Sequence, residues 1–127
     1  MLSLPVTSVF AALFAVALVV LSMWVTLRRI AVKAALGDMA DDELRRRIRA
    51  QGNFIEYVPL ALVCLALVEA GGAPGWLVWT LGGALAAGRA LHAAGMLGSA
   101  TPLRIAGMAL TYMMLITAAA RLAVAAL

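Results

Sequence analysis

The polar side chains with the clearest chemistry in this sequence lie at the start of an otherwise apolar run. Arg49, Asn53 and Glu56 are spaced by four and then three residues, so on a helix all three occupy one face. Gln51 and Tyr57 lie close to that face. Charged side chains persist in apolar helices mainly where they are paired or functional. The segment therefore predicts either contacts that hold helices together or part of a binding site.

Three more polar side chains stand in the later apolar runs. Arg89 and His92 are three residues apart and share a helical face, and Arg104 opens the last run. If the runs pack together, these groups converge with Glu56 in one pocket that holds two or three arginines for each carboxylate. The forked donors of arginine suit a small ligand with carboxylates, and Glu56 and Asn53 suit an ammonium or amide group. A tripeptide with two carboxylates and one amine fits this inventory.

Other chemistries do not fit these residues. One histidine and one distant cysteine, Cys64, cannot make a metal site, so no metal is expected. No glycine-rich phosphate loop follows a strand, and no Ser–His–acid arrangement is apparent. The net charge of +4 comes largely from seven of the ten basic residues, which lie between Arg28 and Arg49. This cluster separates two long apolar runs, which favours a loop at a membrane surface, and no nucleic-acid partner is expected.

The elements that must position these residues are membrane helices. The chain has 127 residues, 65% of them apolar and 13% charged, and a mean hydropathy of +1.04. A soluble domain this short cannot bury that much apolar surface, so a water-soluble monomer is excluded and the lipid bilayer is the expected surrounding. The runs predict an all-α, integral membrane four-helix bundle in a single domain, 1–127, with helices at about 5–27, 41–70, 75–97 and 101–125.

The loops predict the orientation of the bundle. The first loop lies within 28–49 and holds the dense basic cluster, whereas the second, around 69–75, has no lysine or arginine. The third, 97–104, is bracketed by Arg89 and Arg104. The positive-inside rule therefore places the basic loop 28–49 and loop 97–104 in the cytoplasm and both termini on the opposite side.

One segment resembles the signature of a known family. Residues 49–59, Arg-Ala-Gln-Gly-Asn-Phe-Ile-Glu-Tyr-Val-Pro, are similar to that of the MAPEG family, membrane-associated proteins in eicosanoid and glutathione metabolism. Arg28-Arg29, Arg89-x-x-His92 and Arg104 stand in register with it, and the alanine-, glycine- and arginine-rich composition is typical of a bacterial member. The resemblance implies a homotrimer, which in a bacterium would lie in the inner membrane. It also implies glutathione as co-substrate, in a cleft between neighbouring subunits near the cytoplasmic face.

The resemblance also implies roles for individual residues. Arg104 matches the arginine that stabilises the glutathione thiolate and is the expected catalytic residue. Arg28 or Arg29 would reach a glutathione carboxylate from the end of the first helix. The expected glutathione-binding residues are Arg28, Arg29, Arg49, Gln51, Asn53, Glu56, Tyr57, Arg89 and His92.

The sequence departs from the family where some members carry hydroxyl groups. Met96, Ile105 and Met108 stand at positions that hold tyrosine or serine in those members, and Tyr112 lies one turn further along. The residues that would anchor glutathione are kept, whereas the hydroxyl groups are replaced by apolar side chains. Their loss would affect catalytic turnover more than glutathione binding.

Three functions follow from these residues and the resemblance. The first is a glutathione-dependent transferase or peroxidase, which acts by thiolate attack on a lipophilic electrophile that arrives through the bilayer. The second is a glutathione-binding or scaffold membrane protein of the same fold without turnover. A small multidrug-type exporter also has four helices and about this length, but it depends on a carboxylate in its first helix. No acid lies within 5–27, so this third function ranks last.

Overall fold

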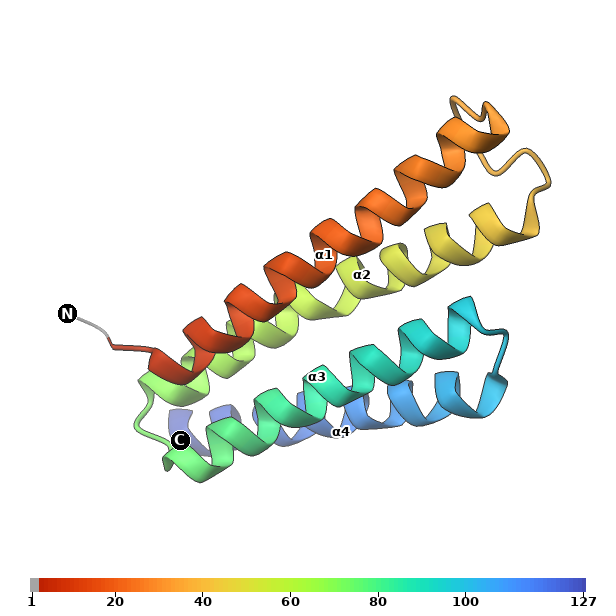
Figure 1. The fold of residues 1–127 in the computed structure, drawn as a ribbon. Helices are drawn as coiled ribbons and strands as arrows, with labels where there is room; N and C mark the ends of the chain where they lie inside the picture. Colours follow the sequence, from red (N-terminus) through yellow and green to blue (C-terminus); the bar gives the residue numbers. More distant parts are fainter. Residues whose placement is uncertain (1–2) are drawn as a thin grey trace.

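The described part of the chain is all-α, as the sequence predicts, and forms four long helices (Figure 1). The computed structural model describes residues 3–127. The helices are α1 (Pro5–Val32), α2 (Asp42–Ala70), α3 (Gly75–Leu97) and α4 (Thr101–Ala126). The first helix continues five residues beyond its expected end at 27 and is closed by Lys33 in the left-handed region.

The four helices run alongside one another as two antiparallel pairs, α1 with α2 and α3 with α4 (Figure 1). Both termini lie at the end of the bundle that holds the α2–α3 loop, and the other two loops lie at the opposite end. Helices α2 and α3 each contact all three of the others, whereas α1 and α4 do not contact each other in the described part of the chain. Helices α2 and α3 thus form the centre of the bundle.

Helices α1, α2 and α4 are each long and apolar enough to cross a membrane. Helix α3 does not meet the same criterion of hydropathy because it carries several glycines together with Arg89 and His92. Its 23 residues nevertheless extend about 34 Å. It also joins the end of α2 to the start of α4 through the short loops 71–74 and 98–100. Because α2 and α4 can cross the bilayer, α3 must return through the same layer between them.

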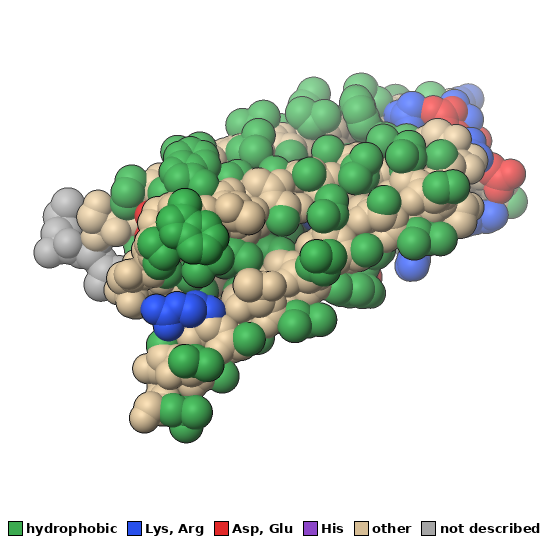
Figure 2. Space-filling model, turned by 90° about the horizontal axis from the view of Figure 1, so that it is seen from below, with side chains coloured by type: hydrophobic (Ala, Val, Ile, Leu, Met, Phe, Trp, Pro, Cys, Tyr) green, Lys and Arg blue, Asp and Glu red, His purple; other side chains and the backbone are tan. Residues whose placement is uncertain are grey.

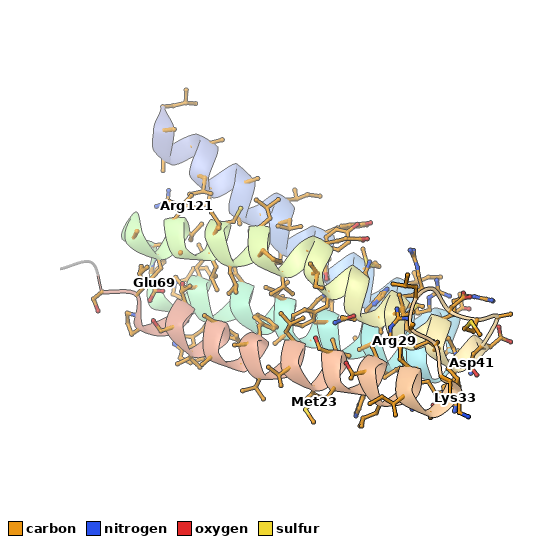
Figure 3. All side chains as sticks on the ribbon, turned by 90° about the horizontal axis from the view of Figure 1, so that it is seen from above. Met23, Arg29, Lys33, Asp41, Glu69 and Arg121 are labelled. Atoms are coloured by element: carbon orange, nitrogen blue, oxygen red, sulfur yellow. The ribbon has the colours of Figure 1, made fainter. Side chains whose placement is uncertain are left out.

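Charged side chains collect at one end of this bundle. Figure 2 shows Lys, Arg, Asp and Glu side chains gathered there, next to a long and mostly apolar face. Figure 3 shows Arg29, Lys33 and Asp41 at this end, and Glu69 and Arg121 at the other. We call the end with loops 33–41 and 98–100 the polar end.

Glu69 caps α1 at the end opposite the polar end. The residue before the helix, Leu4, provides no side-chain acceptor. The Glu69 carboxylate instead accepts hydrogen bonds from the backbone N–H groups of Val6 (2.9 Å) and Thr7 (2.8 Å). A carboxylate is favourable there because the first turn of a helix has free N–H groups and a positive dipole end. The contact ties the start of α1 to the end of α2.

Glycines let α3 and α4 approach closely near the polar end. A Cβ placed on Gly107 would lie 2.5 Å from the backbone nitrogen of His92, and one on Gly95 would lie 2.6 Å from that of Arg104. Real side chains cannot occupy such space, so these positions require glycine. Small residues of this kind allow membrane helices to pack backbone to backbone. The contact brings His92 of α3 next to the first turns of α4.

Candidate functional site

A cavity of about 310 Å³ lies near the polar end and is lined by one stripe from each of three helices. The lining positions follow helical spacing, at 49, 53, 56 and 57 on α2, at 92 and 96 on α3, and at 104, 108 and 112 on α4. We call it the site cavity. Its lining residues are Arg49, Asn53, Glu56, Tyr57, His92, Met96, Arg104, Met108 and Tyr112.

The charged groups of the site cavity have no ion pairs within the chain. Arg49, Glu56 and Arg104 are all exposed. None of them forms a salt bridge in the described residues 3–127. The alternative in which Glu56 locks two helices by pairing with an arginine is therefore not seen in one protomer. Two cations and one carboxylate face the cavity with their charges available.

Arg89 lies beneath the site cavity and is held by neutral partners. It is only 4% exposed. Its Nη1 donates to Oδ1 of Asn53 (2.6 Å) and its Nη2 donates to Oγ1 of Thr111 (2.6 Å). The guanidinium carbon lies 5.4 Å from the centre of the Tyr57 ring, within the range of a cation–π contact. Arg89 thus connects α3 to α2 and α4 and orients Asn53, which lines the cavity.

Two tyrosines bring hydroxyl groups to the site cavity. The hydroxyl oxygens of Tyr57 and Tyr112 are 3.2 Å apart, and their ring centres are 5.8 Å apart. Tyr112 lines the cavity together with Met96 and Met108. The sequence alone does not show whether Tyr112 reaches the site. Ile105 is 65% exposed and does not line it. The cavity therefore has phenol groups even though the three family hydroxyl positions are apolar.

His92 and Arg104 are positioned by the contact between α3 and α4. His92 is buried and borders the cavity from α3, while Arg104 borders it from the first turn of α4. The approach of α4 to His92 depends on Gly107, as described above. The two residues therefore reach the cavity because the helices carrying them touch through glycine.

Four of the residues expected to bind glutathione do not line the site cavity in one protomer: Arg89, described above, and Arg28, Arg29 and Gln51. Arg28 forms ion pairs with Asp41 (2.7 Å) and Glu43 (3.0 Å). Nη1 of Arg29 donates to the backbone carbonyl of Gly37 (2.7 Å). The Gln51 amide points the other way and donates to Oγ of Ser22 on α1 (2.7 Å). A position two residues from Arg49 on a helix faces away from it, which explains the direction of Gln51.

The first loop and the start of α2 form a second group of charges, which we call the loop network. It comprises three further pairs besides those of Arg28: Arg45 binds Asp38 (2.7 Å) and Asp42 (3.0 Å), and Arg47 binds Glu43. The members of the loop network are Arg28, Asp38, Asp41, Asp42, Glu43, Arg45 and Arg47. Every carboxylate of this segment has a partner.

Asp41 is the central acid of the loop network. Its carboxylate binds Arg28 and also caps α2 by accepting from the backbone N–H of Leu44 (2.6 Å). These two hydrogen bonds, that of Arg28 first, lower the pKa of Asp41 to about 2. The Arg45 guanidinium likewise holds the pKa of Asp38 below its ordinary value. The sequence predicts a helix beginning near Asp41, and the cap explains why α2 begins there.

Thr111 is a functional neighbour that reasoning from the sequence missed. It is fully buried, receives a hydrogen bond from Arg89, and donates its own proton to the backbone carbonyl of Gly107 (2.9 Å). Threonine is common in membrane helices, so its type alone carries no signal. Its spacing of seven residues from Arg104 places it on the same face of α4, and this spacing could have identified it.

No group of three or more His, Cys, Asp or Glu side chains that could hold a metal ion occurs in residues 3–127. The donors at the site cavity are guanidinium, imidazole, amide, phenol and one carboxylate. Such a set suits an organic anion that also carries an amine or amide.

These features define a four-helix membrane protein with a small, mainly basic cavity between three of its helices. The model of the MAPEG family matches residues 7–124, and the chain belongs to this family. The resemblance seen in residues 49–59 is thereby confirmed.

Curated relatives agree with this assignment. The chain is 38% identical over 87 residues to the inner membrane protein YecN of Escherichia coli strain K12, and the values for YecN of E. coli O6:H1 are the same. The match covers 68% of this chain and 66%, just under two thirds, of each relative. No solved structure matches the chain.

Proposed function

We propose that this protein binds glutathione in the site cavity and uses it to modify lipophilic electrophiles, as a transferase or peroxidase. The observation that carries the proposal is the presence of Arg49, Arg104 and Glu56, without ion pairs in the protomer, in one cavity of about 310 Å³. This volume lies at the lower end of the range of small-molecule sites, about 300–1,000 Å³. Membership of the MAPEG family supports the same ligand.

The donors of the site cavity suit the groups of glutathione one by one. Arg49 offers a forked pair of donors for a carboxylate, and the Glu56 carboxylate suits the α-ammonium. Arg89 occupies the carbonyl oxygen of the Asn53 side chain, which leaves the amide N–H groups to donate to a ligand carbonyl. The residues present therefore fit a tripeptide with two carboxylates and an amine.

Activation of the thiol is assigned to Arg104, with support from the two phenols. Glutathione supplies the thiol, which as thiolate attacks the electrophile. A free thiol has a pKa of about 8.5 and is largely protonated at neutral pH. Arg104 at the cavity wall lowers that value by placing a positive charge near the sulfur. The Tyr57 and Tyr112 hydroxyls are bonded to each other, so one of them keeps its proton to donate to negative charge that develops in the cavity.

We further propose that the functional unit is a homotrimer and that the site is completed by a neighbouring subunit. Within one protomer, α1 contributes no lining residue to the site cavity. Arg28, Arg29 and Gln51 all lie on the side of the bundle formed by α1 and the start of α2. The same side of a second subunit, placed against the cavity, would supply the missing cations. Mass measurement in detergent that gives a monomer or dimer would contradict this assembly.

A binding or scaffold protein without turnover is the second candidate. The apolar side chains Met96 and Met108 in the cavity wall favour it, since they replace family hydroxyl positions. Under this alternative the protein binds glutathione with no lowering of its thiol pKa and conjugates no electrophile.

We place the protein in a bacterial inner membrane, with the polar end in the cytoplasm. The printed description of the E. coli relatives supports the membrane, and the positive-inside rule supports the orientation. A cysteine introduced at Gly37, in the loop 33–41, should then react with impermeant thiol reagents only after the membrane is opened. Labelling in intact cells would show the opposite orientation, with the polar end outside the cytoplasm.

The test of function is a glutathione titration of the purified protein in detergent, with heat and thiolate absorbance recorded together. We expect saturable binding and absorbance at neutral pH that free glutathione does not give. S-methylglutathione, which lacks the thiol, should bind without this absorbance. Binding without thiolate would select the second candidate, and no binding of either compound would refute both.

A further inference from the structure

A second and larger hollow lies between α1 and α3, away from the site cavity. This apolar groove measures about 550 Å³ and shares no lining residue with the site cavity. Its α1 wall includes Leu13, Ala17 and Val20, and its α3 wall consists of Arg89 and of alanines such as Ala86, Ala90 and Ala93. The small side chains on α3 leave the groove open where α1 and α3 run alongside each other.

The apolar groove has the length of one membrane leaflet. From Leu13 to Trp24 it follows α1 over twelve residues, whose eleven rises of 1.5 Å span about 16 Å. Half of a hydrocarbon core about 30 Å thick is about 15 Å. The groove therefore matches the reach of one acyl chain from the interface to the bilayer centre.

The groove leads to a basic recess at the polar end. This recess, about 270 Å³, is lined by Trp24, Glu43, Arg46, Arg47 and Leu97, and it shares Trp24 with the groove. Arg47 donates to the backbone carbonyl of Trp24 (2.7 Å), which fixes its guanidinium at the junction.

The charge of the recess is positive. Glu43 is neutralised by Arg28 and Arg47, whereas Arg46 has no hydrogen-bond or ion-pair partner in the described chain. A cation without a hydrogen-bonded partner thus stands at the mouth of an apolar channel, within electrostatic reach of Asp41.

We propose that the groove and the recess together bind an anionic phospholipid, with one acyl chain between α1 and α3 and the phosphate at Arg46. Trp24 at the junction suits the interface between chain and headgroup, where tryptophan is enriched. The ligand is membrane lipid rather than a free anion because the recess opens into a leaflet-long apolar channel. The proposal does not depend on glutathione binding, since the two sites have no lining residue in common.

A second copy of the chain fits this surface less well. It would have to bring a carboxylate to Arg46, and five of the six acids are already engaged, four in the loop network and Glu69 at the start of α1. The sixth, Glu56, lines the site cavity. Charge complementarity therefore favours a phosphate.

The test adds single lipids to delipidated protein in neutral detergent. Native mass spectrometry measures lipid binding, and the melting temperature measures stabilisation. Phosphatidylglycerol should bind and stabilise more than phosphatidylcholine, and glycerol phosphate alone should do neither. Arg46→Gln should reduce the preference for phosphatidylglycerol about fivefold, because one basic residue near an anionic surface contributes about 1 kcal/mol. Arg121→Gln, at the other end of the bundle, should retain the full preference.

A second variant tests the groove itself. Ala90→Leu fills it and should weaken binding of both lipids, whereas Ala119→Leu, on an exposed face of α4, should not. Equal binding of the two lipids by the wild type would overturn the proposal. So would stabilisation by glycerol phosphate alone, which would make the recess an anion site. A change of oligomeric state in Ala90→Leu would assign the groove to a second subunit instead.

Discussion

Two groups of charged side chains share the polar end of this molecule, and they differ in whether their charges form ion pairs. In the loop network every carboxylate has an arginine within 3.0 Å. In the site cavity, Arg49, Glu56 and Arg104 have no such partner in the described chain. A charge that already has a partner must give it up before it can bind a ligand. The comparison therefore separates charges that close a loop from charges that are available for binding.

The two groups also differ in how the chain assembles them. The pairs of the loop network all lie within residues 28–47, around a single loop, as Arg45 with Asp42 and Arg28 with Asp41 do. The site cavity draws on α2, α3 and α4, so it exists only when the bundle has packed. Changes in the loop network should therefore alter stability, and changes in the cavity should alter ligand chemistry.

The largest effect is expected at Arg104. A cation beside a thiol lowers its pKa by roughly one to three units, and each unit is a tenfold change in ionisation. Arg104→Ala should therefore reduce the thiolate of bound glutathione at neutral pH by about tenfold or more. The affinity for glutathione should fall less, because Arg49 still binds a carboxylate of glutathione. Thiolate absorbance against pH at saturating glutathione measures the effect.

Two control variants sharpen this prediction. Arg45→Ala removes an arginine of the loop network and should leave the thiolate fraction unchanged. Arg104→Lys should retain part of it, because a point charge still stabilises an anion without the fork geometry. If Arg104→Ala keeps the full thiolate signal, another group activates the thiol, and His92 and Tyr112 are then the residues to test.

The next effect concerns the unpaired acid of the site cavity. Glu56→Gln should weaken glutathione binding about tenfold or more, because a hydrogen bond to a charged group contributes about 1.5–3 kcal/mol. The melting temperature without ligand should stay the same, since Glu56 has no ion pair to lose in the described residues. Calorimetric titration and thermal unfolding in detergent measure the two quantities.

Glu43→Gln is the matched change in the loop network and should behave in the opposite way. Its carboxylate holds Arg28 and Arg47, so its loss should lower the melting temperature and leave glutathione affinity near that of the wild type. Equal loss of stability in the Glu56 and Glu43 variants would remove the distinction between the two groups.

Arg89 belongs to neither group: it is a buried cation whose hydrogen-bond partners, Asn53 and Thr111, are neutral. Thr111→Val preserves the shape of the side chain but removes the acceptor of Nη2. Leaving a buried donor unsatisfied costs about 1–3 kcal/mol, although interhelical hydrogen bonds in membranes are often weaker. We expect a loss of about 1–2 kcal/mol, a few degrees of melting temperature in a chain of this size. Thr117→Val, on an exposed position of α4, is the control and should leave the melting temperature unchanged.

Much of the fold follows from sequence because it depends on local pattern. Apolar runs of membrane-spanning length predict the helices, and acids before bases predict the start of α2 at Asp41. The spacing of Arg49, Asn53 and Glu56 predicts one shared face, and all three line the site cavity. These features need only the periodicity of a helix and the chemistry of its ends.

The remaining features depend on which helices touch. The cap that Glu69 provides joins residues more than sixty positions apart. The contact of Tyr112 with Tyr57 depends on how α4 lies against α2. Arg28 could serve a ligand or an ion pair by its type alone, and the fold of the first loop directs it to Asp41. Such outcomes are set by tertiary packing, which periodicity does not encode.

The smallest effect is expected at Asp41 and is visible only as pH changes. Its pKa is about 2 in the folded protein, below the value of about 3.9 for an unperturbed aspartate. A group with a lowered folded pKa stabilises the fold above its unfolded pKa and loses this contribution as pH falls through the folded value. Asp41→Asn keeps an oxygen acceptor to cap α2 but loses the ion pair with Arg28.

The variant should therefore melt slightly below the wild type at pH 7, and the difference should shrink as the pH falls from about 4 towards 2, because the wild-type carboxylate is then protonated as well. Thermal unfolding in detergent at a series of pH values measures this convergence. Asp42→Asn, whose side chain is 76% exposed, removes a peripheral acid of the same network and should show little difference at any pH. A gap between wild type and Asp41→Asn that stays constant down to pH 2 would mean that the difference in stability does not come from the charge of Asp41. The ion pair with Arg28 would then contribute nothing, and the loop network would be weaker than its distances indicate.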